Sequence, residues 1–353
     1  MTTIGQVMAR PGVGIAVVEA PIPQPGPGDV LIAPSCSYIS AGTELNSVRH
    51  ARSAVVGGSD AALGYSQAGT VVAVGEAVRT VAVGDRVVAV GGRAYHATRT
   101  AVGQNLVVPL PAEVDFGDAA LAAMFCFAIE AVHKSSVQLG EKVLVFGAGM
   151  MGQFAARLYQ LAGADVAVTD GLEFRRSLLP STVKAVGVDD AAWQELAEWA
   201  EPYGIEHAAV CFGGDATEPV QRLKPLLGTA PDGVPHGRIV FPGGASVTVM
   251  MASAMGNIEL LSSAKAGPGY RDPVWEAGAD YPAVYVRHSV RRNVETMIGM
   301  LVTGRLQVSE LITRRMPHTE AAEAYRVLEE TPGELMSILL EYPDGTEAGG
   351  PAQ

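Results

Sequence analysis

The sequence predicts an α/β protein with two domains, one of which contains a doubly wound parallel sheet. Its 353 residues are enough for two domains. Residues 1–110 hold many short apolar runs separated by glycine and proline, a pattern typical of a small β domain. Residues 143–261 alternate strand-like and helix-like segments, which favours parallel strands joined by helices. A glycine motif at the start of this second region indicates the same fold class.

The glycine motif has the form G-x-G-x-x-G and consists of Gly147, Gly149 and Gly152. It follows the apolar run 143–146, which suits a buried strand, and precedes a helical pattern over 151–162. In such a motif the first glycine permits a tight turn, the second leaves room for a pyrophosphate, and the third lets helix and strand approach. The motif therefore predicts a dinucleotide site. The alternative is a glycine-rich turn in another kind of parallel α/β domain.

The residues after the glycines indicate which dinucleotide binds. The first helical turn offers the backbone N–H groups of Met150 and Met151 to the phosphates. The second strand ends at Asp170, near the spacing of about 20 residues expected for an acid that binds ribose. Its carboxylate can accept both ribose hydroxyls and would repel a 2′-phosphate, which predicts NAD. Arg175 keeps NADP as an alternative, because a guanidinium there could bind a 2′-phosphate.

The composition excludes several classes of function. Apolar residues make up 48% and charged residues 18%, so a large core is expected and global disorder is not. The net charge of −12 disfavours nucleic acids and anionic membranes as partners. No apolar run reaches about 18 residues and the N-terminus lacks a signal-peptide pattern, so we expect a cytoplasmic protein that acts on a small molecule. Three scattered cysteines give no disulfide framework.

The N-terminal region, residues 1–110, is expected to be all-β, with any helix confined to a short segment. The connection 21–27 carries four prolines, which exclude a helix there. Residues 49–62 are rich in alanine, glycine and serine and are expected to form a loop or a short helix. Many short strands separated by glycine and proline predict a compact barrel. The expected strands cover residues 14–19, 29–34, 69–75, 84–91 and 105–111.

The remaining elements alternate until residue 261, after which the segment 266–293 shows no periodicity. A flexible tail is expected at 346–353. The expected helices cover residues 118–136, 151–162, 172–180, 215–227, 291–303 and 318–329. The expected strands cover residues 143–146, 164–169, 208–212, 237–242, 257–261 and 337–342.

Four motifs carry a resemblance to a known superfamily: residues 69–75, 83–87, 105–111 and the stretch 142–170. Together they resemble the medium-chain dehydrogenase/reductase superfamily of zinc-type alcohol dehydrogenases. The resemblance implies a GroES-like β-barrel catalytic domain over residues 1–122, completed by 290–345, and a Rossmann cofactor domain over 123–289. It also implies an active site in the cleft between the domains and a homodimer.

Three further motifs resemble a narrower branch of that superfamily. They are Ser40–Glu44, Leu63–Gly69 and Gly267–Pro273. The branch includes relatives of the bacteriochlorophyllide hydroxyethyl dehydrogenases and oxidoreductases of polysaccharide and natural-product pathways. Its substrates are mostly unassigned, so the resemblance points to a reaction type and leaves the substrate open.

The zinc ligands of the superfamily have no equivalent in this sequence. The positions that match them hold Ala41, Tyr65 followed by Ser66, and Ala123. Zinc needs three protein donors and one open position. We therefore expect no metal and a zinc-independent enzyme. The alternative is an unorthodox zinc site built from Cys36, Glu44, His96 or Cys126.

Without zinc, another group must donate the proton and stabilise the substrate oxygen. Tyr65 stands at the position of a metal-binding histidine, and its phenol is a candidate acid. Thr43 matches the hydroxyl residue that relays protons in the zinc enzymes, and Glu44 could orient it or act as base. His96 is a candidate proton shuttle. Each residue also has a structural alternative. Tyr65 could fill the cavity that the metal would occupy, and Thr43 could be an ordinary turn residue. Glu44 could be a solvated loop carboxylate, and His96 could be a structural histidine.

The aperiodic segment is the candidate substrate-binding region, because it gathers aromatic residues and arginines. Tyr270, Arg271 and Trp275 are the residues expected to contact substrate. An arginine there could bind a phosphate or carboxylate of the substrate. The alternative is that the segment packs in the dimer.

These observations lead to a zinc-independent, NAD(H)-dependent oxidoreductase that interconverts a secondary alcohol and a ketone. The expected substrate is a biosynthetic small molecule such as a cyclitol, a sugar or a natural-product intermediate. A first alternative is reduction of a conjugated C=C bond, as in the enoyl and quinone reductases of the same superfamily. A second alternative is a protein that binds the cofactor without turnover.

Overall fold

The computed structural model describes residues 3–53 and 58–343 of the chain. It divides into two compact units, Met1–Ala123 with Gly267–Gln353, and Met124–Ala266. The predicted tail 346–353 lies outside the described residues. No helix within the described ranges is both long and apolar enough to cross a membrane.

The segment 267–289 belongs to the first unit, which differs from the predicted boundary at 289. Side-chain amides of the first unit hold it there. Gln104 Nε2 donates to the carbonyl of Ala277 at 2.9 Å, and Asn105 Nδ2 donates to the carbonyl of Trp275 at 2.7 Å. The sequence could not reveal these contacts, because they join residues that are far apart in the chain.

The second unit is built on a six-stranded sheet in which every recorded strand pair is parallel. The spatial order is β11-β10-β9-β12-β14-β16, so the first strand lies between the second and the fourth. This is the doubly wound order of dinucleotide-binding folds, and it confirms the predicted fold class. The strands are β9 (Lys142–Phe146), β10 (Asp165–Thr169), β11 (Lys184–Val186), β12 (His207–Val210), β14 (His236–Phe241) and β16 (Asn257–Ser262).

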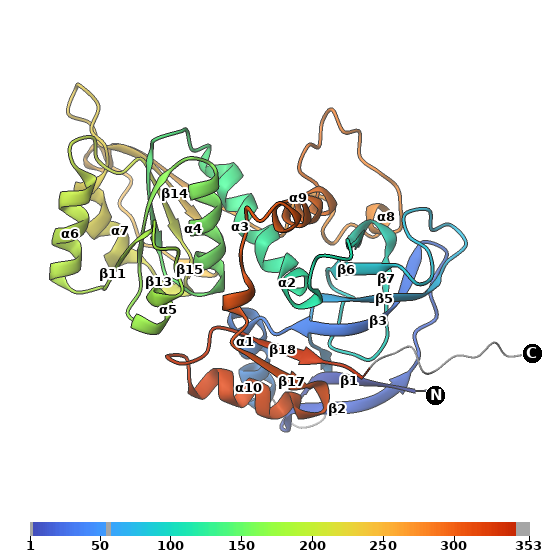
Figure 1. Cartoon of the computed structure of the whole chain (residues 1–353). Coiled ribbons are helices and arrows are strands. Elements are labelled where there is room, and N and C mark those ends of the chain that lie inside the picture. The colour runs from blue at the N-terminus through green and yellow to red at the C-terminus, as the bar shows by residue number, and fades with distance from the viewer. Residues whose placement is uncertain (1–2, 54–57, 344–353) are drawn as a thin grey trace, which may run out of the picture. The chain divides into compact units, whose positions relative to one another are not determined.

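Two apolar clusters cover the two faces of this sheet, because alternate residues of each strand point to opposite faces. Leu144 and Phe146 of β9 pack with residues of α6 and α7, whereas Val143 and Val145 pack with residues of α4. Figure 1 shows α6 and α4 on opposite sides of the sheet. The helices are α3 (Ala122–Ser135), α4 (Met150–Leu161), α5 (Glu173–Ser177), α6 (Asp190–Ala200) and α7 (Thr217–Leu223).

Helix α6 and strand β11 were not among the elements expected from the sequence. The helix starts at Asp189, whose carboxylate accepts the N–H of Ala192 at 2.8 Å. An aspartate at this position is a usual helix start signal. The three residues of β11 are too short to show a periodicity of their own.

The first unit consists mainly of strands arranged in two sheets. A seven-stranded sheet has the order β17-β18-β3-β5-β6-β8, with β7 also paired to β3, and a three-stranded sheet has the order β2-β1-β4. Strand β18 places Leu339 opposite Tyr38 of β3, so a C-terminal strand completes the sheet of the N-terminal region. The strands are β1 (Thr3–Arg10), β2 (Gly14–Pro21), β3 (Asp29–Tyr38), β4 (Ala61–Ala62), β5 (Ser66–Val74), β6 (Arg86–Val90), β7 (Thr100–Gly103), β8 (Val107–Pro109), β17 (Arg314–Pro317) and β18 (Ile338–Glu341).

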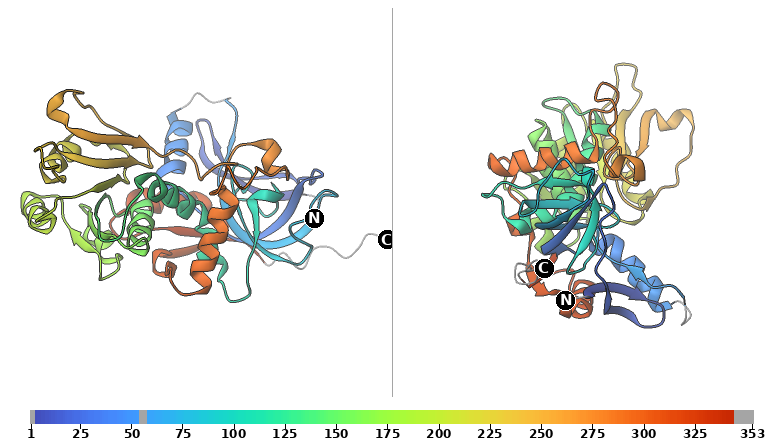
Figure 2. Two further views of the ribbon diagram at one scale, coloured as in Figure 1. Left: turned by 90° about the horizontal axis from the view of Figure 1, so that it is seen from above. Right: turned by 90° about the vertical axis from the view of Figure 1, so that its right-hand side faces the viewer.

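The expectation that residues 1–110 are all-β is wrong, because they contain a helix that is longer and starts earlier than the short one allowed at 49–62. Helix α1 covers Ala41–Ser53, and its buried side includes Leu45 and Val48. Its first turn is stabilised because the Glu44 carboxylate accepts the backbone N–H of Ser40 at 2.9 Å. The helix packs against α10 (Ala321–Glu330), which comes from the opposite end of the chain (Figure 1, Figure 2). The other helices of this unit are α2 (Phe116–Ala120), α8 (Pro273–Glu276) and α9 (Val290–Val302).

Candidate functional site

The predicted glycine turn joins β9 to α4 with the geometry that each glycine was expected to require. Gly147 has φ +93°, a left-handed conformation that favours glycine. A Cβ at Gly152 would lie 1.8 Å from the carbonyl oxygen of Gly147, so no larger residue fits there. A Cβ at Gly149, the N-cap of α4, would meet only Arg175 Nη1, at 3.9 Å. The turn is therefore closed on its helix side and open at Gly149.

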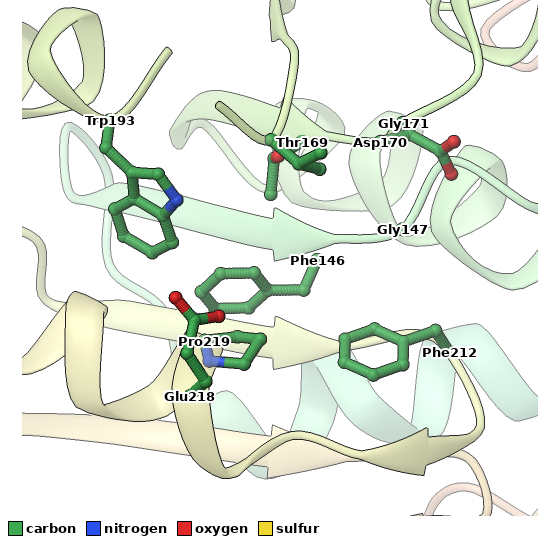
Figure 3. Close-up of a pocket in the computed structure, with 10 residues that line it drawn as sticks. Phe146, Gly147, Thr169, Asp170, Gly171, Trp193, Phe212, Glu218 and Pro219 are labelled. Carbon is green, nitrogen blue, oxygen red and sulfur yellow. The ribbon is translucent and has the colours of Figure 1, made fainter. Parts of the chain in front are cut away.

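Asp170 follows β10 and ties the end of that strand to the glycine turn. Its Oδ2 accepts the backbone N–H of Ala148 at 2.7 Å, and its Oδ1 accepts that of Leu172 at 2.8 Å. In Figure 3 the carboxylate points away from Trp193. Each carboxylate oxygen keeps a second lone pair, so an interaction with ribose stays a prediction. The backbone contacts add a structural role that the sequence did not indicate.

Arg175 of α5 places a positive charge beside the open side of the turn. Its Nη1 is the atom nearest to Gly149, and its buried Nε has no hydrogen-bond partner among the described residues. Helix α5 is held against α4 because Gln153 Nε2 donates to the carbonyl of Arg175 at 2.8 Å. An unpaired guanidinium group, a free helix N-terminus and a glycine without steric cover together suit a phosphate group. The residues present therefore fit a dinucleotide.

A pocket of about 250 Å³ opens at the carboxyl ends of β9 and β10 (Figure 3). Phe146, Trp193 and Phe212 supply its aromatic walls. The Trp193 ring lies 6.1 Å from that of Phe146, and the Arg222 guanidinium covers it at 4.6 Å. Ligands of doubly wound sheets bind at this edge, next to the point where the strand order reverses. The pocket suits a flat, mostly apolar group such as the adenine ring. The remaining lining residues are Gly147, Thr169, Asp170, Gly171, Val188, Glu218 and Pro219.

The sequence analysis did not identify Trp193 or Phe212 as site residues. Phe212 lies two residues after the end of β12, and Trp193 lies in the first turn of α6. Aromatic residues next to strand ends were a signal that could have found Phe212. Trp193 could not be found in this way, because α6 itself was not predicted.

The positions that match the zinc ligands of the superfamily hold no histidine, cysteine, aspartate or glutamate. One of these positions, Ser66, has a structural role. Ser66 Oγ donates to the carbonyl of Ala120 at 2.6 Å and accepts the N–H of Ala123 at 3.2 Å. It therefore holds together the end of α2 and the start of α3. Within residues 3–53 and 58–343, no three His, Cys, Asp or Glu side chains are grouped as metal ligands. The matched positions therefore lack the usual ligands of zinc, and the zinc-independence of the enzyme stays a prediction.

The thiols proposed for an unorthodox zinc site lie in the protein interior. Cys36 and Cys126 are buried free cysteines. Burial raises the pKa of Cys36 to about 12 and raises the pKa of Cys126 well above its ordinary value. Without a metal, this burial favours the protonated thiols over the thiolates.

Tyr65 precedes β5 and lies in a cluster of hydroxyl groups in the first unit. Hydrogen bonds with the Ser40 and Thr43 side chains hold its phenol. Burial raises the pKa of Tyr65, the Glu44 carboxylate raises it further, and the two hydrogen bonds oppose this shift. Thr43 is exposed to solvent, whereas Ser40 is buried. The surroundings keep the phenol protonated, so that it can act as a hydrogen-bond donor and acid.

Glu44 and His96, both predicted to take part in proton transfer, meet in the interior of the first unit. His96 Nε2 donates to Glu44 Oε2 at 3.0 Å, and the same oxygen accepts the hydroxyl of Tyr325. Both side chains are buried, with exposed fractions of 3% for Glu44 and 0% for His96. Their direct contact with a substrate is therefore not supported, and a role in catalysis stays a prediction.

The network continues on the other side of the His96 ring. His96 Nδ1 and Ser37 Oγ form a hydrogen bond of 2.7 Å, and Ser37 Oγ forms a second hydrogen bond of 2.7 Å with the Tyr342 hydroxyl. The sequence analysis missed Ser37, Tyr325 and Tyr342. No local pattern could have found the two tyrosines, since they come from α10 and from the residue after β18.

The predicted substrate residues occupy three different environments. Tyr270 lies close enough to Tyr65 for its charge to raise the pKa of that phenol. Arg271 is exposed and has φ +64°, and its guanidinium lies 5.6 Å from the centre of the Tyr270 ring. Trp275 is buried, with an exposed fraction of 1%, and stacks on Tyr281 at 5.9 Å. Trp275 therefore shapes the segment from inside and offers little surface to a ligand.

Comparisons with known proteins agree with this description. No family profile matches the chain. Sorbitol dehydrogenase of Mus musculus is 26% identical over 360 residues, which cover 90% of this chain and 90% of the relative. A mycocerosic acid synthase-like polyketide synthase of Mycobacterium tuberculosis is 28% identical over 313 residues. That match covers 86% of this chain, and the chain spans only 14% of the length of the synthase.

Solved structures show the same fold across the whole chain. An oxidoreductase/dehydrogenase of unknown specificity from Escherichia coli has a TM-score of 0.78 and 17% identity, and covers 97% of this chain and 100% of its own. An alcohol dehydrogenase from Escherichia coli complexed with NADH has a TM-score of 0.74 and 17% identity, with the same coverage of both chains. At such identities the likeness establishes the fold and leaves the substrate open.

Proposed function

We propose that this chain is an oxidoreductase of the medium-chain dehydrogenase/reductase superfamily, which interconverts a secondary alcohol and a ketone with NAD(H) and without zinc. The glycine turn that is open at Gly149, next to an aromatic pocket, is the observation that carries the cofactor assignment. Sorbitol dehydrogenase, the relative matched over most of both chains, supports an alcohol as substrate.

The cofactor, when bound, delivers a hydride to the carbonyl carbon or accepts one from the alcohol carbon. The second unit would hold it through Gly149, the N–H groups of Met150 and Met151, and Arg175. The pocket around Trp193 would take the adenine. NAD is the proposed form because Asp170 ends β10, and Arg175 supports NADP as the alternative.

Tyr65 is the proposed acid. In the reducing direction its phenol donates a proton to the substrate oxygen as the carbon receives the hydride. In the oxidising direction the phenol oxygen would accept the substrate proton while its own proton passes to the Thr43 hydroxyl. The hydroxyls of Ser40 and Thr43 hydrogen-bond the phenol, and the exposed Thr43 can exchange protons with solvent. The phenol thus takes over the two tasks that a zinc ion would otherwise perform, namely orienting the oxygen and stabilising its charge.

Arg271 is the proposed contact for a polar or anionic part of the substrate. Its strained backbone is retained by a hydrogen bond from its N–H to Glu276 Oε1 at 2.9 Å. Tyr270 connects it to the Tyr65 cluster. A cyclitol, sugar or other hydroxylated intermediate suits these groups, and the expected homodimer remains a proposal.

Tyr65→Phe tests the proposed acid. Removal of the hydroxyl is expected to lower turnover by roughly 100-fold, the usual contribution of a positioned proton donor. NADH affinity should stay unchanged. The measurement is steady-state kinetics on the best substrate from a panel of sorbitol, xylitol, galactitol 1-phosphate and 2,3-butanediol. Tyr203→Phe is the control, because Tyr203 is an exposed tyrosine of the second unit. A rate near that of the unchanged protein would assign Tyr65 to packing.

Reduction of a conjugated C=C bond is the second candidate function. It is favoured by the similarity to the polyketide synthase, over 86% of this chain, and by the position of Arg175 beside the turn. A preference for NADPH and turnover of a 2-enoyl thioester would support it. A preference for NADH and turnover of polyols would exclude it.

A further inference from the structure

We infer that Tyr325 of helix α10 is a positioning residue for Tyr65 and acts on it through the Glu44 carboxylate. This inference rests on the proposed role of Tyr65. Tyr325 lies far from residue 65 in sequence, and it contacts Glu44 through its hydroxyl group. The link therefore joins the C-terminal part of the chain to the residues that hold the candidate acid.

Glu44 is the centre of this link because its two oxygens face different partners. Oε1 accepts the backbone N–H of Ser40 at 2.9 Å, which fixes the residue before α1. Oε2 accepts from the Tyr325 hydroxyl and, at 3.0 Å, from His96 Nε2. A buried carboxylate needs such donors to stay in place. With both donors present, the orientation of Glu44 is fixed from two directions.

The first turn of α1 carries this constraint to the phenol. Ser40 and Thr43, which flank that turn, hydrogen-bond the Tyr65 hydroxyl. Their backbone geometry depends on the contact between Glu44 and the Ser40 N–H. If the carboxylate loses one of its two Oε2 donors, the Ser40 N–H loses a firmly held acceptor, and the hydrogen bonds to Tyr65 become less well aligned.

The position of the Tyr325 hydroxyl is set by packing rather than by the hydrogen bond. Its ring is fully buried in a cluster that includes Leu45, Val48 and Ile338. Helices α1 and α10 contribute to the same cluster (Figure 1). Substitution by phenylalanine keeps this ring and removes only the oxygen, so it separates positioning from packing.

Tyr325→Phe is the variant that tests the inference, and hydrogen exchange at the Ser40 amide is the readout that needs no substrate. We expect exchange to become about 10-fold faster, because the acceptor of this N–H is less firmly held. The ¹³Cζ signal of Tyr65 in tyrosine-labelled protein, assigned with Tyr65→Phe, is expected to shift or broaden. Glu44→Gln should change both readouts in the same direction.

The matched control is Tyr159→Phe. Tyr159 is a buried tyrosine of the second unit that hydrogen-bonds Ser135 Oγ at 2.5 Å, so the same chemical group is lost without a link to Tyr65. It should leave the Ser40 amide and the Tyr65 signal unchanged. A purely structural role of Tyr325 would lower the melting temperature in the same way as this control and leave both readouts unaltered, which would overturn the inference. The inference would also be overturned if Tyr325→Phe failed to fold while Tyr159→Phe folded.

Kinetics distinguish this inference from the proposed function. Tyr325→Phe should lower kcat by about 10-fold and leave the affinity for NADH unchanged, as expected for a misaligned acid. In a Tyr65→Phe background the same change should have no further effect, because the group it positions is absent. A full additional effect there would overturn the inference alone. An unaltered rate in Tyr65→Phe itself would instead refute the proposed acid.

Discussion

Gly149→Asp is expected to leave the fold intact and to weaken NADH binding by roughly 1000-fold. The added side chain meets only Arg175 Nη1, at 3.9 Å from its Cβ, so the protein without cofactor can accommodate it. The carboxylate would stand at the open side of the turn, where two like charges about 4 Å apart repel by about 4 kcal/mol near a protein surface. Energy transfer from the tryptophans of the protein to NADH measures the binding.

Two further variants make this experiment specific. Gly299→Asp adds the same charge at a helical position of the first unit where a Cβ meets nothing within 4 Å, and it should not affect binding. Gly152→Ala should damage both folding and binding, because its Cβ would lie 1.8 Å from the Gly147 carbonyl oxygen. Undiminished NADH affinity in Gly149→Asp would contradict the assignment of this turn to the cofactor.

The free energy of unfolding is expected to fall steeply above about pH 10. Burial raises the pKa of several tyrosines above the ordinary value of 10.0, so the unfolded chain releases these protons at a lower pH than the folded one. The folded state then holds more protons, and stability is lost as the pH rises. Each such group lowers the free energy of unfolding by about 1.4 kcal/mol per pH unit while only the unfolded chain is deprotonated. The tyrosines concerned are Tyr38, Tyr65, Tyr159, Tyr325 and Tyr342.

Urea unfolding at a series of pH values measures this loss. The buried thiols of Cys36 and Cys211 act in the same direction, since burial raises their pKa from 9.0 to about 12. Tyr159→Phe removes one titrating group and should reduce the slope by about 1.4 kcal/mol per pH unit. A free energy of unfolding that stays constant between about pH 9 and pH 11 would contradict the burial of these groups.

The cofactor half of the molecule could be predicted from sequence because its signals are local. The glycines, the helix after them and Asp170 lie within one continuous stretch, and the structure places them in one turn and two strand ends. The pocket was only partly predictable. Trp193 reaches it from a helix whose start signal, Asp189, was overlooked.

The candidate site of the first unit was harder to predict from sequence, because its contacts join distant parts of the chain. The sequence indicated Tyr65, Thr43, Glu44 and His96 one by one. It could not show that Glu44 and His96 meet in a buried network that Tyr325 joins. Trp275 illustrates the same limit. An aromatic residue in an aperiodic segment can face a ligand or the interior, and here the amide of Asn105 and the ring of Tyr281 hold it inside.

The most direct test of the central claim is turnover of the alcohol panel by protein dialysed against a chelator, followed through NADH absorbance. We predict that oxidation of at least one secondary alcohol proceeds with NAD⁺ faster than with NADP⁺, and that removal of metal leaves the rate unchanged. Loss of the rate on chelation with recovery on adding zinc would contradict the claim that the Tyr65 phenol replaces the metal. Binding of NADH with no turnover of any alcohol would contradict the proposed reaction.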